Sequence, residues 1–180
     1  MDKRIFISVS IPEKIKKRLL LEIKKWQDLP IKWVKESNFH ITLVFLGLFD
    51  DDIFLEVLEK IRQISEKTDT FNIEFDKIAL FPSNEEPKTI ALIGTPSEEL
   101  KDLVNTIEEK LGISSALKKS FRPHITLGRI RKNRWEALEV KPTIQEDFKL
   151  PVDVNSIELM SSQLDEDKIN YTILESFPLQ

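Results

Sequence analysis

The chain contains two histidines, and both begin the same tetrapeptide, His-Ile-Thr-Leu. For two unrelated histidines such a match arises by chance about once in a few thousand cases. In each copy polar and apolar residues alternate, which predicts a strand with one buried face. His40 and Thr42 then share one face of the first strand, and His124 and Thr126 share the equivalent face of the second. The repeat predicts two similar lobes, each supplying one imidazole and one hydroxyl.

A strand, a capped helix and a second strand occur in the same order around each tetrapeptide. Ser10 and Thr95 are the predicted N-caps, since Pro and Glu follow each of them within three residues, and Gly112 is the predicted end of the second helix. Hydrophobic periodicity predicts a further helix over 51–65. The predicted strands cover 4–9, 39–46, 71–80, 89–93, 123–131, 148–154, 156–162 and 169–175.

This pattern predicts an α+β fold with two lobes related by a pseudo-two-fold axis. Each lobe is expected to hold an antiparallel sheet with helices on its outer face, and the equivalent strands then face each other across a cleft. At 180 residues the two intertwined lobes fit one domain spanning 1–180. On the strand at 39–46, alternation assigns Phe39, Ile41, Leu43 and Phe45 to the core.

Two histidines and two threonines on facing strands suit displacement at phosphorus. Histidine titrates near neutral pH, so one imidazole can accept a proton while the other donates one. Threonine hydroxyls can hold the phosphate oxygens, although threonine is also an ordinary strand residue. The chain has no Cys, and neither histidine has Asp or Glu two or four residues later. Zinc ligation is therefore the weaker alternative, and we expect no metal and no cofactor.

The net charge of −4 conceals a basic segment at 110–135, which holds eight Lys and Arg and no Asp or Glu. This segment is either an ordinary solvated surface or a landing surface for phosphate groups. The absence of Cys excludes disulfide scaffolds and thiol catalysis. The apolar run at 5–9 is too short for a signal sequence or a membrane span. We therefore expect a cytoplasmic monomer that does not bind membranes.

Four stretches of the chain, spread over nearly its whole length, are similar to one known family. They are Arg4-Ile-Phe-Ile-Ser, the segment 38–47 (NFHITLVFLG), the segment 121–129 (FRPHITLGR), and the tail made of 158–164 (ELMSSQL) and 171–179 (YTILESFPL). On these residues the chain resembles the two-histidine (2H) phosphoesterases, and most closely their RNA 2′,3′-cyclic phosphodiesterase branch, also called 2′-5′ RNA ligases.

The resemblance implies a bilobal α+β fold and metal-independent hydrolysis of a 2′,3′-cyclic phosphate at an RNA 3′ end, leaving a 2′-phosphate. Carried over residue by residue, His40 and His124 are the catalytic acid–base pair, and Thr42 and Thr126 bind the phosphate. The branch assigns the acid to the first motif, although the symmetry of the motifs leaves either order open. Arg129 is implied to clamp the phosphate or ribose.

Strand alternation opposes that role for Arg129, because it places Arg129 on the core face with Ile125 and Leu127. The strand must bulge or end near Gly128 for Arg129 to reach the face of His124, and glycine permits this. The alternative is that Arg129 lies at the end of the strand and only reaches solvent.

The residues that contact the base are open. Members of the branch often carry an aromatic residue in the strand that here spans 89–94, and this chain has none there. Phe49, Trp33 and Trp135 are the candidates, with core packing as the alternative for each.

The predicted substrates are RNA 3′ ends or nucleoside 2′,3′-cyclic phosphates. Two further hypotheses use the same residues. One is a non-catalytic module that binds RNA ends through the basic segment, which would not need two intact His-x-Thr motifs. The other is a related activity, namely 2′-5′ RNA ligation of tRNA halves, cleavage of 2′-5′ linkages, or opening of a small cyclic phosphate.

Overall fold

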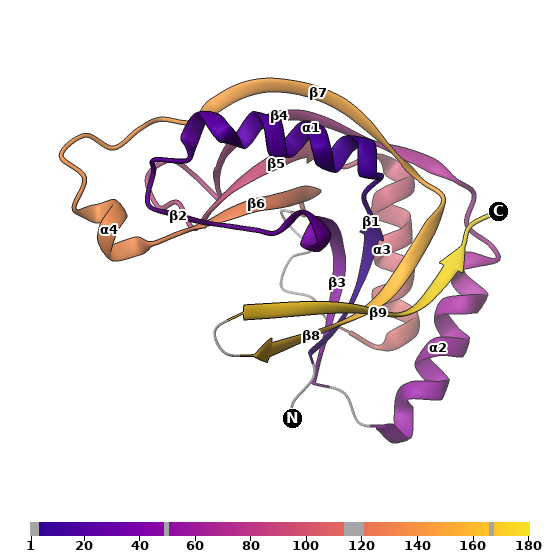
Figure 1. The fold of residues 1–180 in the computed structure, drawn as a ribbon. Helices are drawn as coiled ribbons and strands as arrows, with labels where there is room; N and C mark the ends of the chain where they lie inside the picture. Colours follow the sequence, from indigo (N-terminus) through magenta and orange to yellow (C-terminus); the bar gives the residue numbers. More distant parts are fainter. Residues whose placement is uncertain (1–3, 49–50, 114–120, 166–167) are drawn as a thin grey trace.

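A computed structural model describes residues 4–48, 51–113, 121–165 and 168–180. The strands are β1 (Arg4–Ser10), β2 (Ile31–Trp33), β3 (His40–Leu48), β4 (Phe71–Phe81), β5 (Thr89–Thr95), β6 (His124–Ile130), β7 (Gln145–Val154), β8 (Ser156–Asp165) and β9 (Lys168–Pro178). The helices are α1 (Glu13–Ile23), α2 (Asp51–Ser65), α3 (Glu98–Leu111) and α4 (Lys132–Glu136), with 3-10 turns η1 (Lys24–Trp26) and η2 (Glu36–Asn38). Figure 1 shows the strands as one strongly curved sheet.

The order of the strands confirms the expected two-lobed arrangement. Among the described residues the sheet runs β7-β4-β5-β6-β3-β1-β8-β9, with β2 beside β6, and all pairings are antiparallel. We call β1, β3, β8 and β9 the first lobe and β4 to β7 the second lobe. The expected two sheets meet at β3 and β6 through the pair Ile41 and Ile125, so they form one continuous sheet.

Helices cover the convex face of this sheet, where the main core lies. The apolar faces of β1, β3 and β6 pack there with side chains of α1, α2 and α3, among them Leu19, Ile61 and Leu100. The prediction of helices on the outer face is therefore confirmed. The opposite, concave face carries the polar residues of both tetrapeptides.

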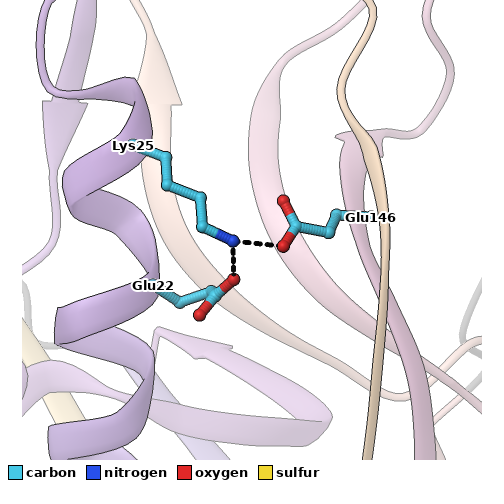
Figure 2. A network of polar contacts seen from close by, with 3 residues as sticks. All are labelled: Glu22, Lys25 and Glu146. Carbon is cyan, nitrogen blue, oxygen red and sulfur yellow. Dashed lines mark hydrogen bonds and ion pairs between the residues drawn. The ribbon is translucent and has the colours of Figure 1, made fainter.

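The helix of the first repeat packs against the second lobe. From α1, the Arg18 guanidinium lies 5.1 Å from the centre of the Phe148 ring on β7. Lys25 in η1 forms ion pairs with both Glu22 of α1 and Glu146 of β7 (Figure 2). These contacts hold α1 and η1 against β7 of the second lobe.

The structure corrects both predicted N-caps. The first helix begins two residues later than Ser10 allows, after Pro12, and the backbone N–H of Ser10 instead donates to Glu158 at 3.0 Å. In α3 the cap is Ser97, whose hydroxyl accepts from the Leu100 N–H at 3.2 Å. Thr95 still belongs to β5, and its hydroxyl donates to Asp76. Both β1 and β5 run further than their patterns predicted.

The other predicted helix boundaries are confirmed. The helix predicted over 51–65 from its periodicity is α2, which spans Asp51–Ser65. Gly112 ends α3 in the left-handed conformation, with φ of 65°. Both boundaries depend on local sequence alone, which explains why they could be read directly.

Candidate active site

The pairing of β3 with β6 brings the two tetrapeptides together on the concave face. Ile41 and Ile125 are fully buried on the convex face and lie opposite each other. Extending this antiparallel register by one residue in each direction pairs His40 with Thr126, and Thr42 with His124. The four side chains therefore share the concave face at the pseudo-two-fold axis. The repeat predicted strands that face each other across a cleft; instead β3 and β6 are neighbours in one sheet, which brings the two tetrapeptides side by side.

A β-bulge brings Arg129 to the same face. Thr126 lies opposite Ala91 on β5, whereas Gly128 lies opposite Ile90, so β6 contains one extra residue at Leu127. The alternation therefore restarts, and Arg129 pairs with Thr89 on the face of Thr126. Gly128 is needed here, because a Cβ at this position would lie 2.4 Å from a methyl of Ile31.

An equivalent bulge in β3 corrects one core prediction. Thr42 lies opposite Ser8 and Val44 lies opposite Ile7, so Leu43 is the extra residue. Phe45, assigned to the core by simple alternation, consequently shares the face of Thr42 and is 62% exposed. Phe39, Ile41 and Leu43 are buried as predicted.

Both imidazoles are held by the same local contact. Nδ1 of His40 lies 2.7 Å from the backbone carbonyl of Asn38, and Nδ1 of His124 lies 2.9 Å from that of Arg122. Because a carbonyl only accepts, each Nδ1 carries the proton and donates it to this bond. Nε2 is then the nitrogen that can exchange a proton with a substrate.

Aromatic side chains that the sequence did not single out line the two imidazoles. Phe6 and Tyr171 lie with ring centres 5.1 Å and 4.9 Å from that of His40. Phe81 stacks on His124, with ring centres 4.6 Å apart and planes at 21°. Such contacts fix the ring positions. Phe6 shares one face of β1 with Ser8, so the two-residue period of the strand could have identified Phe6 as a residue of the concave face.

The environment of His40 opposes a positive charge. Burial is the main cause that lowers the pKa of His40 below its ordinary value of 6.5. The bond to the Asn38 carbonyl raises this pKa, while the positive charges of His124 and Arg129 lower it further. That both charges act on His40 is consistent with all three groups lying around one site.

The candidate base-contact residues lie elsewhere or outside the described part. Trp135 is 3% exposed and belongs to the core. Trp33 is half-buried, and its ring lies under Gly128, so it supports β6. Phe49 falls outside the described residues, as do Lys118 and Lys119 of the basic segment.

The site can hold an anion and move protons on either side of it. Two Nε2 atoms, two hydroxyls and one guanidinium gather on one concave surface, which is the set that a phosphoryl group requires. Within the described ranges, no three side chains of His, Cys, Asp or Glu gather where they could hold a metal ion.

Comparison with known proteins shows the family of this chain. The family described as the 2′-5′ RNA ligase superfamily matches residues 11–166. The RNA 2′,3′-cyclic phosphodiesterase of Aquifex aeolicus is 36% identical over 171 residues, which cover 87% of each chain. The enzyme of the same name from Bacillus subtilis is 32% identical over 127 residues, 69% of each chain.

The chain therefore belongs to the 2′-5′ RNA ligase superfamily, the 2H phosphoesterases. Solved structures share its fold. A Thermus thermophilus protein has a TM-score of 0.81 at 24% identity, covering 98% of this chain and 97% of its own. E. coli LigT, solved in complex with 3′-AMP, has a TM-score of 0.77 at 22% identity and covers 99% of each chain.

Proposed function

We propose that this protein hydrolyses 2′,3′-cyclic phosphates at RNA 3′ ends and releases RNA with a 2′-phosphate. One observation carries the proposal: two identical His-x-Thr pairs meet across the β3–β6 junction, each with its imidazole Nδ1 tied to a backbone carbonyl. The RNA 2′,3′-cyclic phosphodiesterases that match most of the chain support this activity.

In this mechanism His124 takes a proton from a water molecule, which attacks phosphorus in line with the 3′ oxygen. The bond between phosphorus and the 3′ oxygen breaks, and His40 gives its proton to that oxygen. Thr42 and Thr126 donate hydrogen bonds to the non-bridging oxygens, and Arg129 neutralises their charge. The 2′ oxygen keeps the phosphate, and one water molecule is consumed.

The acid role requires His40 to be protonated when substrate is bound. Burial and nearby cations lower the pKa of His40 in the free protein. A bound phosphodiester brings a negative charge beside the ring, which favours the imidazolium. Substrate binding and protonation of His40 are therefore coupled in this proposal.

The aromatic residues beside His40 suit the base of the terminal nucleotide. Phe45 is exposed, and its ring centre lies 6.0 Å from that of Phe6, which in turn meets Tyr171 edge to face at 5.6 Å. An exposed ring on this surface can stack on any base, since every base has an aromatic face. This fits RNA ends of varied sequence.

The decisive assay uses a short RNA that ends in a 2′,3′-cyclic phosphate, incubated with the purified protein and EDTA. We expect turnover despite EDTA and a 2′-phosphate product, identified by mass spectrometry and resistance to a 3′-specific phosphatase. A 3′-phosphate product would contradict the assigned leaving oxygen. Binding without turnover would contradict catalysis and favour the RNA-end-binding module.

We further propose that nucleoside 2′,3′-cyclic phosphates are also accepted, and that the enzyme is a cytoplasmic monomer. None of the helices in the described ranges combines the length and apolar character needed to cross a bilayer. Light scattering after gel filtration tests the monomer, and fractionation of the native cells tests the compartment.

A further inference from the structure

The strand that carries the second motif continues directly into a group of exposed cations. β6 ends at Ile130, and α4 begins two residues later. Arg131, Lys132 and Arg134 are exposed, and we call these three side chains the α4 ridge. None of them is part of the group formed by the two His-x-Thr pairs.

The α4 ridge is firmly attached to the fold. Trp135 of α4 is 3% exposed and packs in the main core. The Arg131 N–H donates to the carbonyl of Pro30 at 2.9 Å, and the Arg131 carbonyl accepts from the Trp135 N–H at 2.9 Å. In Figure 1 α4 projects from one end of the sheet. The backbone that carries these cations is therefore held in place at the end of β6.

Other cations connect the ridge with the site. Lys32 on β2 pairs with Arg129 across the strands and is exposed. Lys88, also exposed, precedes β5, and its carbonyl accepts from the Ile130 N–H at 2.9 Å. Acidic residues border the ridge: Glu136 lies 3.9 Å from Lys132, whose side chain is 83% exposed, and Glu85 and Glu86 precede Lys88.

We propose that the α4 ridge binds the phosphates of the RNA strand that leads to the cyclic end. This inference rests on the proposed function, because the strand must start at the His-x-Thr pairs. The terminal base then lies toward Phe45 in the first lobe, and the upstream strand leaves the site along β6 in the second lobe. The protein therefore distinguishes an oligonucleotide from a single nucleotide.

The geometry sets the length of strand that the ridge can contact. Because β6 holds one extra residue at Leu127, the backbone advances by about four strand residues from Thr126 to Arg131, or about 13 Å at about 3.3 Å per residue. A helically stacked strand rises about 3.4 Å per nucleotide, so this span equals roughly four nucleotides. A dinucleotide therefore cannot reach Arg131, whereas an octanucleotide extends past it.

The test compares three substrates that end in a 2′,3′-cyclic phosphate: a mononucleoside, a dinucleotide and an octanucleotide. The variant is R131Q/K132Q/R134Q in the full chain. The matched control is K14Q/K17Q/K24Q, which removes three exposed cations from α1 and η1, on the convex side of the sheet. Both variants change the net charge equally.

We expect the ridge variant to raise KM for the octanucleotide about tenfold at 0.1 M salt and to leave kcat/KM for the two short substrates within twofold. The slope of log(kcat/KM) against log salt for the octanucleotide should become shallower by up to about 2, since each phosphate that a cation neutralises adds about 0.7 to it. The control should change neither. Equal losses on all three substrates, or no loss on the octanucleotide, would overturn the proposal.

A binding measurement separates this proposal from the proposed function. Fluorescence anisotropy with a 5′-labelled octanucleotide that already ends in a 2′-phosphate needs no turnover. We expect the ridge variant, and not the control, to weaken this binding about tenfold. If the wild-type protein binds without hydrolysing the cyclic substrate, the proposed function fails and the ridge is still tested. Equal binding by wild type and ridge variant rejects the ridge.

Discussion

The two histidines have the same backbone setting but different neighbours. Each donates through Nδ1 to the carbonyl two residues earlier and precedes a β-bulge. Around His40 the concave face is polar and aromatic, with Ser8 opposite Thr42 and the buried Glu158 opposite Ser8. Around His124 the surface is apolar, formed by a small cluster of Ala79, Ala91, Ile93 and Phe81.

The bulges give the clearest difference between the lobes. Phe45 follows His40 by five residues, and Arg129 follows His124 by five, so the pseudo-two-fold axis relates an exposed aromatic ring to a guanidinium. The repeated backbone places the two His-x-Thr pairs, whereas the unmatched side chains give each lobe a different surface. Substitutions on the two sides of the axis are therefore expected to have different effects.

The largest effect is expected from removing either imidazole. Both His40→Ala and His124→Ala should lower kcat about 10²- to 10⁴-fold, the usual contribution of a general acid or base. Only one should recover with a substrate whose 3′ oxygen is replaced by sulfur, because a thiolate leaves without a proton. We expect His40→Ala to recover. Recovery of His124→Ala would reverse the assignment, and circular dichroism checks the fold of both.

Arg129→Gln should lower kcat/KM about 10- to 100-fold, because a charged hydrogen bond to the phosphate contributes about 1.5–3 kcal/mol. The loss should be equal for mononucleoside and octanucleotide substrates, measured as initial rates. A loss confined to the octanucleotide would place Arg129 with the upstream strand instead of the reacting phosphate.

The pH dependence follows from the lowered pKa of His40. An acid must be protonated, so the fraction of free protein with a charged His40 should fall tenfold per pH unit above a pKa lower than 6.5. NMR titration of the His40 imidazole measures this pKa, and a bound 2′-phosphate nucleotide should raise it. A pKa of His40 above 6.5 in the free protein would contradict the dominant effect of burial.

Phe45→Ala should raise KM about 5- to 150-fold and change kcat little, since base stacking contributes about 1–3 kcal/mol and acts on binding. Phe45→Tyr is the matched control and should retain the wild-type KM. An unchanged KM in Phe45→Ala would remove the base-binding role from the first lobe.

Gly128→Ala should have the smallest effect, a loss of about 1–3 kcal/mol in the free energy of unfolding. The new Cβ would lie 2.4 Å from Ile31 and 3.0 Å from the Trp33 ring, both in contact with the core. For a chain of this size the melting temperature should fall by roughly 2–12 °C in calorimetry. An unchanged melting temperature would show that β2 can move away from the new methyl group without loss of stability.

The sequence predicted what depends on local pattern. The repeated tetrapeptide identified both strands and their buried faces, and it predicted that the two motifs come together, although across a cleft and not on neighbouring strands. The prediction that Arg129 reaches the concave face only through a bulge near Gly128 is confirmed, because glycine in a strand is itself a local signal.

Features that depend on which strands pair could not be predicted from the sequence. Phe45 was assigned to the core because nothing in its own sequence marks the bulge at Leu43, which exists only relative to β1. Tyr171 reaches His40 from β9, more than 120 residues away, through a strand order that periodicity does not give. The roles of the site residues stay predictions until the assays above are made.

The interleaved strand order also limits the order in which the two lobes can fold during synthesis. The second lobe is built from one continuous stretch, 71–154, whereas the first lobe combines β1 and β3 with the last two strands. Arg4 pairs with Ser162, and the N–H and carbonyl of Gln180, the last residue, bond to Thr68 and Thr70. A nascent chain can therefore assemble the surroundings of His124 first, while the edge of β1 that pairs with β8 stays open. His40 therefore gains its contact with Tyr171 only after β9 has been made.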